Sequence, residues 1–509
     1  MSVARKILGS TVSQFAGKLA VGLLSIIVIK LLTGYLTQEQ YGEYNFIYDF
    51  LAVFGIVADL GLYTVAVREM SKDESRVAVL LGNVLTIRTV VAIIAMVAAV
   101  CVGFLIPIFM PEHAEGMVPI GIAIASITVL LAILNGTLTS VLQVKYRMRE
   151  SAIALVIGKI ISIGYIAYIV LVAFTQNPAD GFHHIIAAGI IGNAAMLGYT
   201  YWYTRRLTEI RYRFDWKLIK EVFIKALPYG LALMLSTIYF RLNTILLFQI
   251  KGAEEVAFYS VGMRLIESLT IISLYFMNSV LPVMTRSIES RDGRHSSIIQ
   301  NAFDFLSMMG FAMVAGGFVL AYPIIAIVSD PEYLSRLSEG VYGSDIGLQI
   351  LLFALMFSFI NTLFSFVLIS VNKQTRLLWI NIGAIVLNLL LNWLVIPEYG
   401  FRGAAMTSVI AELYIAIITY HAARKYLKFD LRFTNFMKII ISAIVMGTIV
   451  WLLREPTFTL LENKNVILLI PVGGVLYAAM LWITGVITRA RVREIFRKEA
   501  KGEPEILGE

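Results

Sequence analysis

The chain has 509 residues, of which 59% are hydrophobic and only 15% are charged, and its mean hydropathy is +0.80. Soluble globular proteins carry about 25% charged residues, so this composition excludes an ordinary soluble protein and indicates an integral membrane protein. The net charge of +8 falls in loops beside the membrane, as described below, so nucleic acid is not expected as a partner.

The sequence lacks the usual marks of an enzyme or a metal site. Its single cysteine, Cys101, cannot form an intrachain disulfide. The five histidines lie in or beside loops without HExxH or CxxC spacing, and the chain has no P-loop, DxD or nucleophile elbow. We therefore expect no catalytic residues, no metal and no cofactor. Uphill transport would need a partner, the membrane potential or an ion gradient.

A membrane span needs about 20 apolar residues, and the hydrophobic runs predict an all-α polytopic protein with about 14 transmembrane helices. The first run keeps Lys18 and Lys30 and is expected to be a retained span rather than a cleaved signal. The predicted spans are residues 10–34, 42–66, 77–109, 117–143, 150–175, 183–204, 221–248, 254–283, 297–328, 346–371, 377–396, 402–423, 434–453 and 465–488.

Basic residues alternate between the two sides of this arrangement. The N-terminus and the loops after the even-numbered spans hold roughly 29 of the 42 Lys and Arg. These loops are Arg68–Arg76, Lys145–Glu150, Arg205–Lys220, Arg286–Ser296, Asn372–Arg376, Arg424–Arg432 and Arg489–Lys501. The opposite loops hold Lys251, Arg336, Arg402, Arg454 and Lys464. The positive-inside rule then puts both termini in the cytoplasm of a cytoplasmic-membrane protein.

A weak internal repeat suggests two similar halves. Gln38–Leu51 aligns with Ala253–Ile266 at a constant offset, which matches Glu39 to Glu254. Six spans separate the two segments, so the halves would be parallel repeats with substrate between them, around a central cavity; chance similarity of two turns is the alternative. The predicted domains are six-helix lobes at 1–215 and 216–428, helices 13 and 14 at 429–489, and a basic then acidic cytoplasmic tail at 490–509.

Charged and amide side chains lie within several spans, where each needs a polar partner, a water-filled cavity or a functional role. The seventh span carries Arg241 and Asn243, and Arg264, Glu267 and Asn278 share one stripe of the eighth. Asn45, Asp49 and Asp59 share a face of the second span. Gln14, Lys18, Arg88 and Asn388 add polar groups to spans one, three and eleven.

Each of these groups also has a structural interpretation. Arg88 could tie helices together in a buried pair. Arg264 and Glu267 are three residues apart and could neutralise each other on one helix. Lys18 could extend to the membrane interface.

Several segments resemble one transporter family. They are LTQEQYGEYNFIYDF, ADLGLYTVAVREMS, the YFRLNTILLF…EEVAFYSVGMRLIESL…VLPVMTR block, NKQTRLLWI and PEYGFRGAAMTSVIAE. In order and spacing the chain is similar to polysaccharide or oligosaccharide flippases of the polysaccharide-transporter type. Their superfamily also holds multidrug and toxic-compound extruders and lipid II flippases. The family often has aspartate where this chain has Asn243, which weakens a charge-coupled role there.

The resemblance implies an alternating-access carrier for a lipid-linked saccharide, with glycosyltransferases or a polymerase as further partners. Its anionic diphosphate suits the donor fork of arginine. Arg241 and Arg264, with Arg88 and Lys18, are the candidate diphosphate contacts. The residues that could bind sugar hydroxyls are Gln14, Asn45, Asn243, Asn278 and Asn388. Asp49, Asp59 or Glu267 would carry H⁺ or Na⁺ for coupling.

Two other functions are compatible with the sequence, and a non-transporting scaffold is a third possibility that the intramembrane charges argue against. A multidrug extruder of the same superfamily would use acidic residues against cationic drugs and usually has twelve spans. A membrane glycosyltransferase or polymerase would need catalytic acids in a sizeable outer loop. The longest outer loop here is Ser329–Asp345, whose acidic residues lack an obvious paired spacing.

Overall fold

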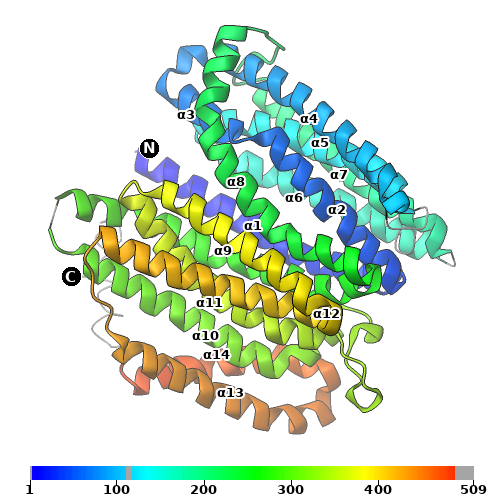
Figure 1. Cartoon of the computed structure of the whole chain (residues 1–509), viewed down its shortest axis with the longest axis vertical. Coiled ribbons are helices and arrows are strands. Elements are labelled where there is room, and N and C mark those ends of the chain that lie inside the picture. The colour runs from blue at the N-terminus through cyan, green and yellow to red at the C-terminus, as the bar shows by residue number, and fades with distance from the viewer. Residues whose placement is uncertain (1–2, 110–116, 176, 291, 488–509) are drawn as a thin grey trace. The chain divides into compact units, whose positions relative to one another are not determined.

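The computed structural model describes residues 3–109, 117–175, 177–290 and 292–487 (Figure 1). The predicted tail at 490–509 lies outside these ranges. Within them the fold is all-α, as predicted, and one isolated bridge joins Arg336 to Val341. The α-helices are α1 (Val3–Thr33), α2 (Gln38–Asp59), α3 (Leu62–Lys72), α4 (Val77–Phe109), α5 (Met117–Val144), α6 (Met148–Tyr168), α7 (Pro178–Thr204), α8 (Trp216–Lys251), α9 (Ala253–Ser290), α10 (His295–Val328), α11 (Ser344–Ser370), α12 (Gln374–Tyr426), α13 (Phe433–Leu461) and α14 (Asn465–Ile483).

Twelve segments of the described chain are long and apolar enough to cross a membrane. Two of them, Gln374–Tyr426 and Phe433–Ile483, each fold back on themselves. In α12 the Thr407 hydroxyl donates to the Asn392 amide oxygen at 2.6 Å. Fifteen residues of straight helix would rise about 22 Å, so the chain must reverse between the two, at Gly400 (φ 55°, ψ −134°).

The second reversal joins α13 to α14. Glu462 has φ 50° at the end of α13, and the Asn465 amide donates back to the Arg454 carbonyl at 3.2 Å. If each of these two segments crosses the membrane twice, the twelve segments correspond to the fourteen transmembrane helices that the sequence predicts.

The second predicted span, 42–66, is interrupted. Leu60 and Gly61 both adopt left-handed backbone angles (φ 37° and 73°), which end α2 and start α3. The 22 residues of α2 rise about 33 Å, enough to cross the hydrocarbon layer alone. Helix α3 is a separate amphipathic element, with Leu62 and Met70 buried in a core cluster that α4, α5 and α8 complete.

The chain divides into two compact units, Met1–Ser260 and Val261–Glu509. In the first, α5 packs on α2, α4 and α7, α6 packs on α1 and α7, and α8 packs on α2 and α3. In the second, α11 packs on α10 and α12, while α13 and α14 pack on each other and on α10. Compactness alone does not say which helices move together, so the predicted lobe boundary after residue 215 stays a prediction.

Helices α2 and α8 lie against each other in antiparallel fashion (Figure 1). Near one end Gly230 approaches Leu60 so closely that a Cβ on Gly230 would lie 2.3 Å from the Leu60 carbonyl oxygen. Near the other end Phe46 stacks on Phe248, with 3.8 Å between ring centroids. These contacts fix the register of the two helices between them.

Candidate functional site in the membrane-spanning helices

The register of α2 and α8 brings together two charges that the sequence separates by 192 residues. Arg241 lies eleven residues after Gly230, and Asp49 lies eleven residues before Leu60. The Arg241 Nη1 donates to Asp49 Oδ1 at 2.9 Å, and the side chains are 22% and 6% exposed. A carboxylate this deep in apolar surroundings needs a counter-charge, and Arg241 supplies it.

Two amides flank this pair. Asn45 lies one turn before Asp49, is buried, and donates to the Tyr41 carbonyl of its own helix at 2.8 Å. Asn243 is buried two residues after Arg241 and donates to the Tyr259 hydroxyl at 3.3 Å. Tyr259 is fully buried near the start of α9, so Asn243 links α8 to that helix. The sequence did not single out Tyr259 as a functional residue; its place in the repeat was its only signal.

A second buried pair lies where α2 is interrupted. Arg88 of α4 is 4% exposed, and its Nη2 lies 2.7 Å from Asp59 Oδ1. Asp59 also accepts from the Tyr63 backbone N–H at 3.4 Å, so it caps the start of α3. The Nε and Nη1 of Arg88 are buried without a hydrogen-bond partner in the described chain. The interpretation that Arg88 joins two helices through an ion pair therefore explains the position of Nη2 but not of Nε and Nη1.

In the second unit Arg264 and Glu267 neutralise each other on α9. Their Nη1 and Oε2 lie 3.0 Å apart, and both side chains are about one quarter exposed. Asn278 lies further along the same stripe and is exposed. The pair leaves part of each group accessible, whereas in the Arg88–Asp59 pair the arginine is buried and only Asp59 is partly exposed.

Amides of the second unit form two hydrogen-bonded networks. Asn392 donates to Asn388 at 2.8 Å and accepts from Thr407. The reversal at Gly400 brings Thr407 close to Asn392, and the sequence did not point to this contact. The Asn388 Nδ2 is buried and has no partner among the described residues. Asn361 of α11 donates to Glu412 at 3.3 Å.

The remaining predicted residues lie on α1, which packs on α6. Gln14 is half-buried there, and Lys18 is exposed. Lys18 lies at the middle of α1 and near the start of the apolar segment Ala16–Thr33. An exposed ammonium there is compatible with either a substrate contact or an interfacial position, so the role of Lys18 stays a prediction.

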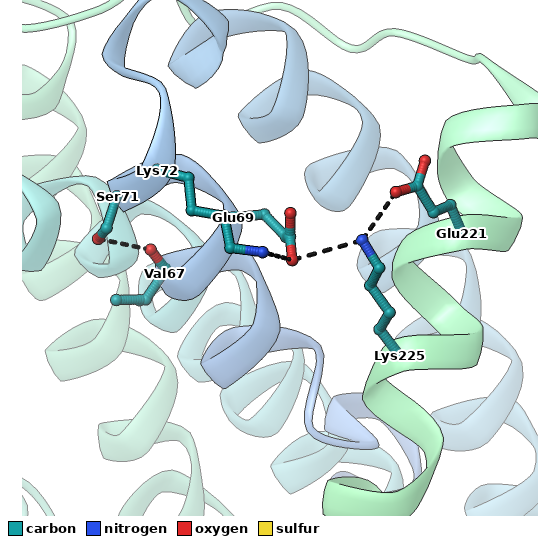
Figure 2. Close-up of polar contacts among 6 residues, drawn as sticks. All are labelled: Val67, Glu69, Ser71, Lys72, Glu221 and Lys225. Carbon is teal, nitrogen blue, oxygen red and sulfur yellow. Dashed lines mark hydrogen bonds and ion pairs between the residues drawn. The ribbon is translucent and has the colours of Figure 1, made fainter.

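Charged residues at one end of the first unit tie α8 to α3 (Figure 2). Lys225 of α8 contacts Glu221 at 2.7 Å and Glu69 at 3.5 Å, and Lys72 contacts Glu69 at 2.7 Å. The positive-inside prediction puts this cluster at the cytoplasmic surface. Surface pairs of this kind contribute little individually, but here they join two helices that the core already holds together.

An apolar groove of about 490 Å³ lies between α10, α11 and α13 in the second unit. Phe311, Phe318, Phe353 and Trp451 are among its walls. Pro323 lacks the N–H that would bond the Val319 carbonyl in α10, and Arg454 Nη1 donates to that carbonyl at 3.4 Å instead. The groove thus has apolar walls and one cation near its rim.

Taken together, the candidate membrane spans of the described residues and the charge pairs held within them indicate a polytopic membrane protein. The sequence model of the family described as "Polysaccharide biosynthesis protein" matches residues 7–288, more than half of the chain. The chain belongs to this family. A second family model, MatE, matches residues 228–394. A search of curated proteins found no match.

Solved structures show the same fold. Lipid II flippase MurJ in an inward closed conformation has 15% identity and a TM-score of 0.71, over 93% of this chain and 98% of that one. An inward-facing MATE multidrug resistance transporter of the MOP superfamily has 17% identity and a TM-score of 0.61, over 80% and 97%. A MOP superfamily transporter from Pyrococcus furiosus has 16% identity and a TM-score of 0.59, and the match covers 82% of this chain and 95% of that one. The chain therefore has the same fold as the MurJ and MATE structures.

Proposed function

We propose that the protein is a flippase that moves a polyprenyl diphosphate-linked oligosaccharide across the cytoplasmic membrane by alternating access, for the biosynthesis of a cell-surface polysaccharide. The observation that carries this proposal is the match to the polysaccharide biosynthesis family over residues 7–288. That region includes all three intramembrane arginines and every candidate residue except Asn388.

The Arg241–Asp49 pair suits the handling of an anionic linker. In the empty carrier Asp49 neutralises the arginine. A diphosphate takes over this role through the bidentate donor geometry of the guanidinium, which leaves Asp49 with excess negative charge. Uptake of H⁺ or Na⁺ by Asp49 then restores neutrality, so substrate binding and ion binding are coupled through one side chain.

The partly exposed Arg264 offers a second donor fork, and Glu267 is its resident counter-charge. The exposed amide of Asn278 and the neighbouring polar side chains offer hydrogen bonds to sugar hydroxyls, while the polyprenyl tail stays in lipid. Glycosyltransferases that build the saccharide and a polymerase that consumes it are the partners this function requires.

The extent of the structural matches favours a lipid-linked substrate. The MATE structures cover about four fifths of this chain, whereas the MurJ structure covers 93%. The groove between α10, α11 and α13 involves one of the two C-terminal helices that a twelve-span extruder lacks. An apolar groove between these helices offers a surface on which an isoprenoid chain could lie.

A cation-drug extruder is the second candidate, because the MatE model matches residues 228–394. It would use Glu267 or Asp49 as the contact for a cationic drug. Both carboxylates already pair with an arginine, so drug binding would have to displace a guanidinium from each. A diphosphate must likewise displace a carboxylate from each arginine, so this cost is common to both candidates.

An enzyme of lipid-linked sugars is less compatible with the acids of the Ser329–Asp345 segment. Asp330 caps a short helix by accepting from the Glu332 N–H at 3.3 Å. Asp345 accepts from the Ser335 N–H and hydroxyl at 2.9 and 2.7 Å, and Glu339 pairs with Arg336 at 3.1 Å. These three carboxylates stabilise the loop rather than form a catalytic pair.

Binding measurements on the purified protein separate the candidates. We expect a short-chain polyprenyl diphosphate sugar to bind at least tenfold more tightly than the matching monophosphate, because the second phosphate adds charge-assisted hydrogen bonds to arginine. We expect ethidium, a cationic dye, to bind weakly. Tight dye binding with no preference for the diphosphate would instead support the extruder.

A further inference from the structure

A polar pocket of about 420 Å³ lies where the two ends of α12 meet. Because α12 reverses at Gly400, Tyr426 at its end lies beside Arg376 near its start, and the Arg376 Nε donates to the Tyr426 hydroxyl at 2.9 Å. The lining residues are Asn372, Lys373, Thr375, Arg376, Trp379 and Tyr426. The mechanism proposed above uses none of them.

Two cations of this pocket form no ion pair with the residues that the structure describes. The Lys373 ammonium lies 5.2 Å from the centroid of the Tyr426 ring, and the Arg376 guanidinium lies 6.0 Å from it. Within the described chain neither forms an ion pair, whereas nearby Arg424 contacts Asp430 at 3.3 Å. Two exposed cations on either side of a shared space attract an anion, and the Thr375 hydroxyl adds a hydrogen-bonding group.

The pocket also has an apolar wall at the membrane boundary. It lies in the connection between two membrane-crossing helices, and the Trp379 side chain, 64% exposed, faces it one turn into α12. Exposed indole rings at such positions favour the headgroup region of a bilayer. A ligand that satisfies both features carries an anionic group and an apolar body.

We propose that this pocket binds the phosphate group of an anionic membrane phospholipid, between Lys373 and Arg376, with the start of its acyl chains against Trp379. Basic pockets between transmembrane helices hold anionic headgroups in this manner, and the volume lies within the usual range for ligand sites, about 300–1,000 Å³. The inference needs only that the chain spans a membrane; it does not depend on the transported substrate.

Native mass spectrometry in detergent with added phosphatidylglycerol tests the site. The double substitution Lys373→Gln, Arg376→Gln is expected to weaken the first bound phosphatidylglycerol about 25-fold, since each basic residue near an anionic lipid contributes about fivefold. Lys373→Arg with Arg376→Lys should retain binding. Phosphatidylcholine, whose headgroup is zwitterionic, should bind wild type and the double variant equally.

The matched control removes two exposed arginines that already have a carboxylate partner. Arg211 and Arg213 are 75% and 40% exposed, and both contact Glu209, at 2.9 and 3.0 Å. Arg211→Gln with Arg213→Gln should change phosphatidylglycerol binding less than threefold. Equal losses in the two double variants would show nonspecific charge attraction and overturn the site. Displacement of the lipid by millimolar inorganic phosphate would show a free-anion site and overturn the assignment to a lipid.

Discussion

The Asp49–Arg241 pair leads to the sharpest prediction, for the substitution Asp49→Asn. Asparagine keeps the size of the side chain but removes the charge that neutralises Arg241, which is only 22% exposed. Breaking a buried pair by removing one partner costs about 3–5 kcal/mol. The partial exposure of Arg241 lowers this cost by solvent screening, so we expect a loss of about 2 kcal/mol in the free energy of unfolding.

Thermal unfolding in detergent measures this loss. For a unit the size of Met1–Ser260, about 2 kcal/mol corresponds to a Tm lower by about 4–8 °C. Arg241→Gln should cost a similar amount, since it leaves Asp49 as the unpaired buried charge. The double variant Asp49→Asn, Arg241→Gln replaces the ion pair with two amides and should recover most of the Tm.

The double-mutant cycle also tests whether the Asp49 and Arg241 side chains interact. Additive losses in the double variant would mean that the two side chains do not interact. Wild-type Tm values in both single variants would mean that each charge has enough water or another partner. In either case the pair could not be the neutral resting state that the coupling scheme requires.

Arg88→Leu should lower the Tm more than Arg88→Lys, because leucine leaves the Asp59 carboxylate without its 2.7 Å counter-charge whereas lysine retains a cation; equal Tm values would contradict the buried pair. Gly42→Ala should reduce folded yield several-fold, because its Cβ would lie 1.8 Å from the Ala253 carbonyl oxygen, while Gly474→Ala, where nothing lies within 4 Å, is the control and should keep wild-type yield. In a Cys101→Ser background, the variant Arg211→Cys should react with a membrane-impermeant thiol reagent only after cells are opened, whereas Arg336→Cys should react in intact cells. The reverse pattern would contradict the predicted topology.

The membrane fold could be predicted from hydropathy because each span is a long apolar run with a polar boundary. The reversal at Gly400 was visible as the short polar segment between the predicted spans 377–396 and 402–423. The end of α2 was missed, since two left-handed residues, Leu60 and Gly61, interrupt an apolar run without changing its composition. The start of α9 at Ala253 aligns with the start of α2 at Gln38 at the same offset as the repeat.

The site was predictable only where partners are local in sequence. Arg264 and Glu267 are one helical turn apart, so their pairing was among the sequence-based interpretations, and the structure contains it. The partner of Arg241 lies 192 residues away on α2. Hydropathy and spacing carry no information about such a contact, because it depends on how α8 packs on α2.

The central claim is that the intramembrane arginines serve the translocation of a diphosphate-linked saccharide. Its most direct test is the rate at which a fluorescent polyprenyl diphosphate saccharide crosses the bilayer of proteoliposomes, for wild type and for the Arg264→Gln variant at equal amounts of folded, inserted protein. We predict rapid translocation by the wild type and a loss of at least a hundredfold in the variant. Translocation by the wild type no faster than in protein-free liposomes, or an unchanged rate in the variant, would contradict the account.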